Sequence, residues 1–393
     1  MIKIIKLGLK ICTTSILIQK AKQDDCLHPA TGCRHIYMEE CMISISLCMI
    51  VKNEENTLAR CLDSVKDIVD EIIIVDTGST DRTIDIARKY TNNIYQFKWI
   101  DDFSAARNFA FQHASKDYVL TMDADDTFQD KEKLLRLKET LPSYVNAITM
   151  KYHAAFDEGG NVLASLRQVR LVKRSKQFKW HGAVHEFLDV SGEVLHSDII
   201  ICHKRIHQNN NRNLLIYRKR LNEGIPFTPR DLFYYGNELY DNSYYVEAIP
   251  VYKDFIKTEN HWLEDERTAY RKLSDCHSEM GDVDNAIHYI LKTFQCGSPR
   301  SEDCCRLGFL FMQKNEPRTA LHWFQYATIL PEIDDGSIIN HGCSTWIPHL
   351  QLCVCHSMLG NSHKAYQHIV IAYKFNPTNK LILENKYLLE AHI

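Results

Sequence analysis

Acidic and amide side chains follow three apolar runs of this chain, at the point where each run ends. Runs typical of buried strands at residues 43–51, 71–75 and 118–122 end in Asn53 and Glu55, in Asp76, and in Asp123 and Asp125. In an open parallel sheet, ligands bind outside the carboxyl ends of the strands. Because three successive strands end in this way, we expect these side chains to meet at one rim of a sheet.

The two carboxylates of Asp123 and Asp125, one residue apart, suit a hard divalent cation. Mg²⁺ or Mn²⁺ prefers oxygen ligands and keeps open positions that a diphosphate can fill. The chain has no G-x-G-x-x-G after the first strand and no P-loop motif, so phosphates must be held by metal and side chains instead of a glycine-rich loop. This pattern favours a nucleotide diphosphate whose β-phosphate leaves, and a nucleotide-sugar is the natural candidate.

The elements that must position these groups alternate between strand and helix up to about residue 205, which is the signature of an α/β layer. Helical spacing of apolar residues predicts helices over residues 56–66 and 80–90. A third helix is expected to run to about residue 114, with Ser104 as its N-cap.

After residue 229 the pattern is helical throughout, and four segments align on one another. Each segment has a small residue twelve positions before an alanine: Gly236 and Ala248, Ser274 and Ala286, Gly308 and Ala320, Cys353 and Ala365. Small residues at this spacing let two helices pack closely, and the pattern resembles the tetratricopeptide repeat. An unrelated helical bundle is the alternative.

Four strings in order, LCMIVKNEE, EIIIVDTGSTDRT, DDFSAARNFAF and YVLTMDADD, resemble family 2 glycosyltransferases of the GT-A fold over residues 43–205. The later KWHGAVHE and the attached repeats resemble the bacterial subgroup that includes the sublancin-type peptide S-glycosyltransferases. The expected fold class is therefore an α/β GT-A (Rossmann-like) domain followed by an all-α tetratricopeptide-like domain.

The resemblance implies a nucleotide pocket lined by Asn53 and Glu55, with Asp76 accepting a hydrogen bond from the nucleobase, usually uracil. The alternative for Asp76 is a structural cap of the turn that follows its strand. In the family, the pair Arg107–Asn108 holds the nucleotide end of the donor site, whereas a solvated helical arginine is the alternative. Arg170 is expected to face the diphosphate.

The sequence Asp123-Ala124-Asp125 matches the D-x-D metal motif of the family. By that resemblance Asp125 contacts the metal, Asp123 contacts the ribose, the metal or both, and His203 is the candidate third ligand. A satisfied core histidine is the alternative for His203. The neighbouring Asp126 is expected either to contact the metal ligands without binding the metal or to be exposed to solvent.

Glu186 is the candidate general base, because the family places a carboxylate base before a metal-binding histidine, and His185 can exchange roles with either Glu186 or His203. The expected function is metal-dependent inverting transfer of a sugar from a nucleotide-sugar to a Cys, Ser or Thr side chain of a peptide or protein. One alternative is the same chemistry on a cell-envelope glycan or lipid carrier. The other is a non-catalytic repeat scaffold that binds a nucleotide-sugar.

The expected organisation is an extension over 1–42, poorly ordered or wrongly started, a transferase domain over 43–208, a linker helix over 209–228 and repeats over 229–393. With 47 basic and 50 acidic residues the net charge is −3, so we expect no nucleic-acid partner. No run approaches 18 apolar residues, so no integral membrane segment is expected. The 14 scattered cysteines are interpreted as reduced, hence a cytoplasmic protein, and the repeats also suit a homodimer.

Overall fold

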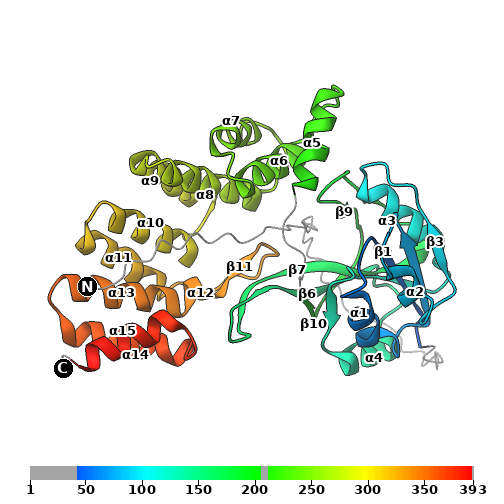
Figure 1. Cartoon of the computed structure of the whole chain (residues 1–393), viewed down its shortest axis with the longest axis horizontal. Coiled ribbons are helices and arrows are strands. Elements are labelled where there is room, and N and C mark those ends of the chain that lie inside the picture. The colour runs from blue at the N-terminus through cyan, green and yellow to red at the C-terminus, as the bar shows by residue number, and fades with distance from the viewer. Residues whose placement is uncertain (1–41, 205–210, 392–393) are drawn as a thin grey trace, which may run out of the picture. The chain divides into compact units, whose positions relative to one another are not determined.

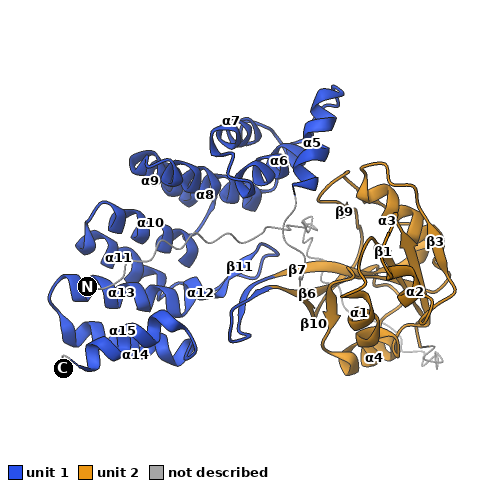
Figure 2. Ribbon diagram, in the orientation of Figure 1, with its two compact units in different colours: residues 1–14, 155–165, 210–393 blue, residues 15–154, 166–209 orange. Residues whose placement is uncertain are grey.

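The computed structural model describes residues 42–204 and 211–391, which form two compact units (Figures 1 and 2). The α/β unit comprises the described residues of 42–154 and 166–204, and the helical unit those of 155–165 and 211–391. The expected N-terminal extension lies outside the described residues except for Met42.

The α/β unit is built on a mixed sheet with the strand order β3-β2-β1-β4-β7-β6-β10-β5. The strands are β1 (Ile45–Val51), β2 (Glu71–Asp76), β3 (Ile94–Gln96), β4 (Tyr118–Thr121), β5 (Asp126–Phe128), β6 (Ala147–Phe156), β7 (Val162–Lys173) and β10 (Val194–His203). Strand β1 pairs in parallel with both β2 and β4, while β7 runs antiparallel to β4 and β5 runs antiparallel to β10. This confirms the α/β fold class, and it places the ends of β1, β2 and β4 at one edge.

Short helices and a small ribbon surround this sheet. They are α1 (Leu58–Val65), α2 (Thr83–Ala87), α3 (Phe103–Gln112) and α4 (Lys131–Thr140), with β8 (Trp180–His181) paired antiparallel to β9 (Phe187–Leu188). Helix α1 buries Leu58, Cys61, Leu62 and Val65, the i, i+3, i+4, i+7 pattern of a helix with one face in the core.

The N-cap predicted for α3 is wrong by two residues. Asp102 is the N-cap, and its Oδ1 accepts hydrogen bonds from the backbone N–H of Ala105 at 2.9 Å and from Ser104 Oγ at 2.7 Å. An ionised carboxylate accepts more strongly than a hydroxyl at a helix N-terminus. Ser104 therefore lies within the first turn.

The helical unit consists of α5 (Arg212–Asn222) and then antiparallel helix pairs. The pairs are α6 (Pro229–Asp241) with α7 (Tyr245–Ile256), α8 (Leu263–Glu279) with α9 (Val283–Lys292), α10 (Ser301–Gln313) with α11 (Pro317–Ala327), and α13 (Trp346–Met358) with α14 (Ser362–Phe375). The short α12 (His341–Ser344) precedes α13, α15 (Lys380–Glu390) packs on α14, and β11 (Ile339–Asn340) pairs with residues 164–165 of β7.

The small residues of the predicted repeats lie where paired helices approach most closely. A Cβ added to Gly236 would lie 2.7 Å from the Tyr252 ring, and one added to Gly308 would lie 2.5 Å from the Phe324 ring. The four alanines at the matching positions of the partner helices are all completely buried: Ala248, Ala286, Ala320 and Ala365. Helix pairs in close contact through small residues are what the tetratricopeptide-like pattern predicts.

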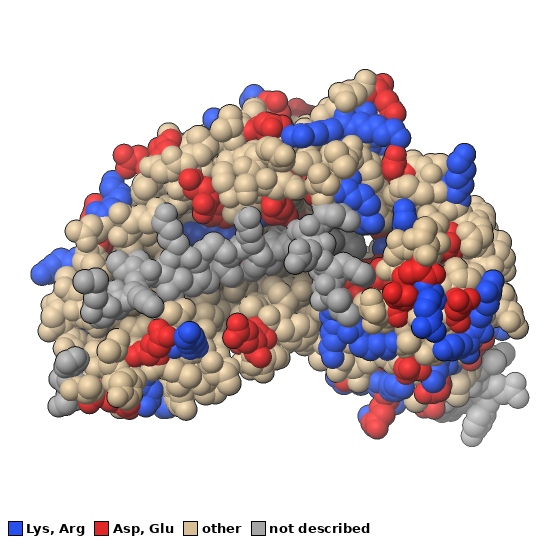
Figure 3. Space-filling model, viewed as in Figure 1, with Lys and Arg blue, Asp and Glu red and all other residues tan. Residues whose placement is uncertain are grey.

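Charged side chains of both signs lie on the surface of the molecule. Figure 3 shows Lys and Arg side chains interspersed with Asp and Glu on the face in view. Within residues 42–204 and 211–391, no helix has the length and apolar character needed to cross a membrane. The cysteines of these residues are buried and unpaired.

We predict that Gly308→Val destabilises the helical unit by about 2 kcal/mol, because overpacking costs about 1–3 kcal/mol and the gain in helix propensity over glycine is only a few tenths. Thermal melting followed by circular dichroism measures the change. The double variant Gly308→Val with Phe324→Leu should recover part of the loss, since it shortens the ring that the new side chain meets. An equal or larger loss in the double variant would contradict the steric explanation.

Candidate active site

The candidate site lies at the edge where the parallel strands β2, β1 and β4 end. The register pairs Val51 with Asp76 and Cys48 with Thr121, so the segments that follow these strands leave the sheet side by side. The structure thus brings the predicted Asn53, Asp76 and Asp123 segments to one rim, as expected for a parallel sheet.

The carboxylate of Asp76 is bound by the turn that follows it. Its side-chain oxygens accept the backbone N–H groups of Gly78 and Ser79 at 3.1–3.2 Å, and Asp76 is only 2% exposed. Gly78 has φ of +104°, which a residue with a Cβ rarely adopts. Asp76 therefore caps the turn that follows its strand, which is the structural alternative given above. A hydrogen bond from Asp76 to a nucleobase would be an additional role and stays a prediction.

Asn53 and Glu55 fasten the loop after β1 to the loop after β2. Asn53 Oδ1 accepts the backbone N–H of Thr80 at 2.8 Å, and Glu55 Oε2 accepts that of Arg82 at 3.2 Å. These bonds give the first rim a defined backbone shape. The role of both side chains in lining a nucleotide pocket is not tested by this geometry.

Asp126 lies in the middle of residues 123–128, called here the acidic segment, and is completely buried. Its Oδ1 accepts the Tyr152 hydroxyl at 2.9 Å and lies 3.3 Å from His203 Nδ1. Its Oδ2 accepts the backbone N–H of Asp123 at 3.1 Å and lies 3.4 Å from Arg170 Nη2. The solvated alternative for Asp126 is therefore wrong, and sequence reasoning missed the central place of this residue.

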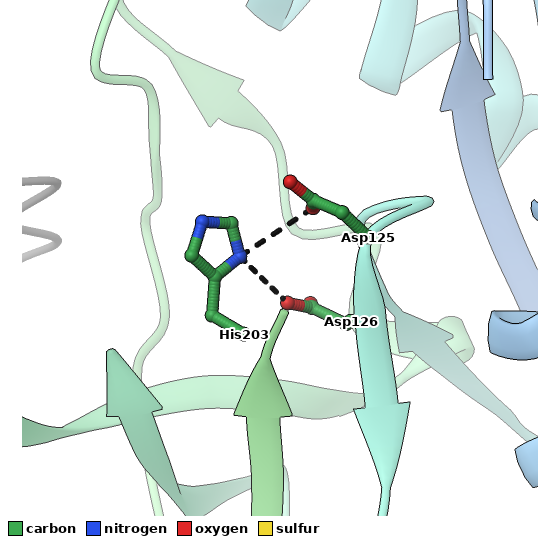
Figure 4. Close-up of side chains that lie close together, drawn as sticks. All are labelled: Asp125, Asp126 and His203. Carbon is green, nitrogen blue, oxygen red and sulfur yellow. Dashed lines mark hydrogen bonds and ion pairs between the residues drawn. The ribbon is translucent and has the colours of Figure 1, made fainter. Parts of the chain in front are cut away.

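A group able to hold a metal ion is formed by Asp125, Asp126 and His203 (Figure 4). One possible ligand atom from each lies within 4.8 Å of the others, and His203 Nδ1 is 3.4 Å from Asp125 Oδ1. Two carboxylates and an imidazole fit Mn²⁺ or Mg²⁺ by ligand type. The predicted ligand set was Asp123, Asp125 and His203; in the structure Asp123 Oδ1 instead pairs with Arg107 Nη2 at 2.7 Å.

Burial and neighbouring charges shift the pKa values of these acids in opposite directions. Burial raises the pKa of Asp125 to about 6, and although His203 opposes this, Asp123 and Asp126 add to it. Burial also acts on Asp123, but Arg107 and Arg170 outweigh it and hold the pKa of Asp123 well below its usual value. Asp123 is thus a fixed anion, whereas Asp125 takes up a proton at a higher pH than an ordinary aspartate does, and a divalent cation bound there would oppose that protonation.

Arg107 on α3 joins the acidic segment to the candidate base. Its Nε lies 2.5 Å from Glu186 Oε1 and its Nη2 lies 2.7 Å from Asp123 Oδ1, while its guanidinium stacks on the Trp180 ring at 4.9 Å. The side chain is 12% exposed, so the solvated-arginine alternative is wrong. Arg107, Asp123 and Glu186 therefore form one ion-paired row.

The segment that carries Glu186 is held by α3 through its backbone. Asn108 Nδ2 donates to the Trp180 carbonyl and Asn108 Oδ1 accepts the Trp180 N–H, both at 2.9 Å. The N–H of Phe103 donates to the carbonyl of Ala183 at 2.8 Å. His185 precedes Glu186 with φ of +50°, and both residues are at least 90% buried. Asn108 thus contacts the segment of the candidate base in this structure.

Arg170 on β7 lies beneath the acidic segment, with its side chain 4% exposed. Besides Asp126, it lies 3.8 Å from Asp123 Oδ2, and it stacks on the Tyr152 ring at 4.7 Å. In the structure the guanidinium of Arg170 thus faces these two aspartates. Its contact with a diphosphate stays a prediction.

Comparison with known proteins agrees with this geometry. Residues 46–191 match the family model described as glycosyl transferase family 2. The chain is 38% identical over 159 residues to a TPR repeat-containing protein of Synechococcus elongatus, which covers 40% of this chain and 38% of that protein.

It is also 29% identical over 231 residues to the SPbeta prophage-derived glycosyltransferase SunS of Bacillus subtilis, covering 54% of this chain and 53% of that one. The chain thus spans about half the length of these curated relatives, or less. The solved structure of YrrB, a TPR protein with an unusual peptide-binding site, aligns with a TM-score of 0.34 at 16% identity, covering 45% of this chain and 82% of that one.

We predict that Arg170→Met lowers the free energy of unfolding of the α/β unit by about 3–5 kcal/mol, because it leaves the buried carboxylate of Asp126 without its cation. Urea unfolding, with hydrogen exchange on β5 and β7, measures the effect and assigns it to this unit. The control Arg88→Met breaks an exposed pair with Asp85 and should change stability by less than about 0.5 kcal/mol. Equal losses of stability in the two variants would contradict the conclusion that Arg170 stabilises the unit by neutralising Asp126.

Proposed function

We propose that this protein is a metal-dependent inverting glycosyltransferase that moves a sugar from a nucleotide-sugar to an acceptor by a single displacement. The favoured donor is a UDP-sugar. The observation that carries the proposal is the row in which Arg107 joins Asp123 to Glu186, next to the group formed by Asp125, Asp126 and His203. The match of residues 46–191 to family 2 glycosyl transferases supports it.

The residues of the chain have separate parts in this reaction. Asp125 and His203 are the proposed ligands of Mn²⁺ or Mg²⁺, with Asp126 and Asp123 as further candidates beside them. When bound, such an ion supplies positive charge that stabilises the leaving diphosphate. Asn53, Glu55 and Asp76 form the proposed rim for the nucleotide, and Arg170 supplies a buried positive charge beside Asp123 and Asp126.

Glu186 is the proposed general base that removes the proton of the attacking acceptor group. Its ion pair with Arg107 fixes the direction of the carboxylate. His185, the neighbouring residue, is the second candidate for this role.

The proposed acceptor is a Cys, Ser or Thr side chain of a peptide or protein, because stacked helix pairs offer an extended surface for a peptide chain. A cell-envelope glycan or lipid carrier is the second candidate. We further propose the domain boundaries expected from the sequence and a cytoplasmic location; the buried, unpaired cysteines support a reduced environment.

The metal assignment predicts that Asp125→Asn lowers Mn²⁺-dependent sugar transfer about 100-fold or more, since one anionic ligand is lost. The assay incubates the full chain with UDP- and GDP-sugars and Mn²⁺, then measures hydrolysis and transfer to peptide and lipid acceptors. Asp85→Asn, which removes an exposed acid of α2, is the control and should act like the wild type. Full Mn²⁺-dependent transfer by Asp125→Asn would reject the metal site.

The base assignment predicts that Glu186→Gln binds donor with normal affinity, yet loses about 10²–10⁴-fold in turnover. The glutamine keeps the size of the side chain but cannot accept the proton of the acceptor. His185→Gln tests the second candidate in the same assay. Turnover that survives in Glu186→Gln but falls in His185→Gln would transfer the role of base to His185, and unchanged turnover in both would reject the mechanism.

A further inference from the structure

Helix α1 contacts the backbone of the acidic segment through three side chains. Cys61 Sγ donates to the carbonyl of Asp123 at 3.4 Å, Arg60 Nη2 donates to that of Asp125 at 3.4 Å, and Ser64 Oγ accepts the N–H of Phe128 at 2.9 Å. Residues 60, 61 and 64 lie on one side of a helix because of its 3.6-residue period. The acidic segment is thus fixed to a helix that is itself anchored in the core.

Arg60 also reaches the end of β10, immediately after His203. The same Nη2 donates to the carbonyl of Lys204 at 2.8 Å, and the N–H of Lys204 donates to the carbonyl of Asp125 at 2.9 Å. The backbone at Asp125 and the backbone next to His203 are therefore joined both directly and through Arg60. These two elements carry the side chains whose separation decides whether one ion can bind both.

We propose that Arg60 is a positioning residue for the metal site: by binding both backbone segments, its guanidinium sets the separation of Asp125 and His203. It contacts neither side chain's ligand atoms in the structure, so its effect passes through the backbone. The inference rests on the proposed metal-dependent function. Groups that orient metal ligands typically contribute 10–100-fold to metal affinity.

An electrostatic role and a positioning role of Arg60 predict opposite changes in metal affinity when the residue is replaced. A guanidinium near a divalent cation repels it, so a purely electrostatic Arg60 would weaken metal binding, and its removal would tighten it. A positioning Arg60 strengthens binding, and its removal would weaken it. The sign of the change therefore distinguishes the two roles without reference to catalysis.

The test measures Mn²⁺ affinity of the full chain without donor, by electron paramagnetic resonance of the free ion. Arg60→Met should raise the Kd for Mn²⁺ about 10-fold or more. Arg60→Lys keeps the charge but offers a single ammonium in place of the planar guanidinium, so its Kd should lie between those of Arg60→Met and the wild type. Arg60→Lys also provides the decisive measurement if Arg60→Met does not fold.

Lys66→Met is the matched control, because it removes a positive charge from the end of the same helix, where Lys66 pairs with the exposed Asp63. Its Kd should stay within about twofold of the wild type. If the wild type binds Mn²⁺ and neither Arg60 variant has a higher Kd than the wild type, the positioning role of Arg60 is overturned. The proposed metal dependence would stand in that case. Failure of the wild type to bind Mn²⁺ would overturn the proposed metal dependence, and the inference on Arg60 with it.

Discussion

The structure depends on the neutralisation of several carboxylates gathered in one small part of the α/β unit. Asp126 is fully buried, and Asp123 and Asp125 lie within three residues of it, so their mutual repulsion opposes folding. Arg170 and Arg107 supply the opposing charge, and the hydroxyl of Tyr152 satisfies one of the buried oxygens. The acids can remain close together because these cations come from other strands and helices of the same unit.

Each element around the site has a definite part in this arrangement. The parallel strands β1, β2 and β4 deliver their polar ends to one edge. Arg170 comes from β7, which runs antiparallel to β4, and His203 is the last residue of β10, which runs parallel to β6 and antiparallel to β5. Helix α3 fixes the segment of Glu186 through Asn108, and helix α1 contacts the acidic segment through Cys61. The chemistry of the site therefore rests on backbone contacts as much as on its charged groups.

The sequence predicted the elements and the rim but not the partners of each side chain. Apolar runs followed by Asn53, Asp76 and Asp123 were sufficient to place these residues at one edge, because side-by-side parallel strands leave few alternatives. The role of Asp126 was not predictable, since its partners Tyr152 and His203 are distant in sequence. The N-cap at Asp102 was predictable in principle, from an acid directly before the helix.

The position of Arg107 has a consequence for how the protein tolerates change. One guanidinium serves as the counter-charge of both Asp123 and Glu186, so the two carboxylates share a single electrostatic environment. A substitution at either acid frees the cation to shift toward the other, and the effects of double substitutions will not be the sum of the single ones. Libraries that vary this site should therefore change Arg107, Asp123 and Glu186 jointly, because the effects of substitutions at these three positions depend on one another.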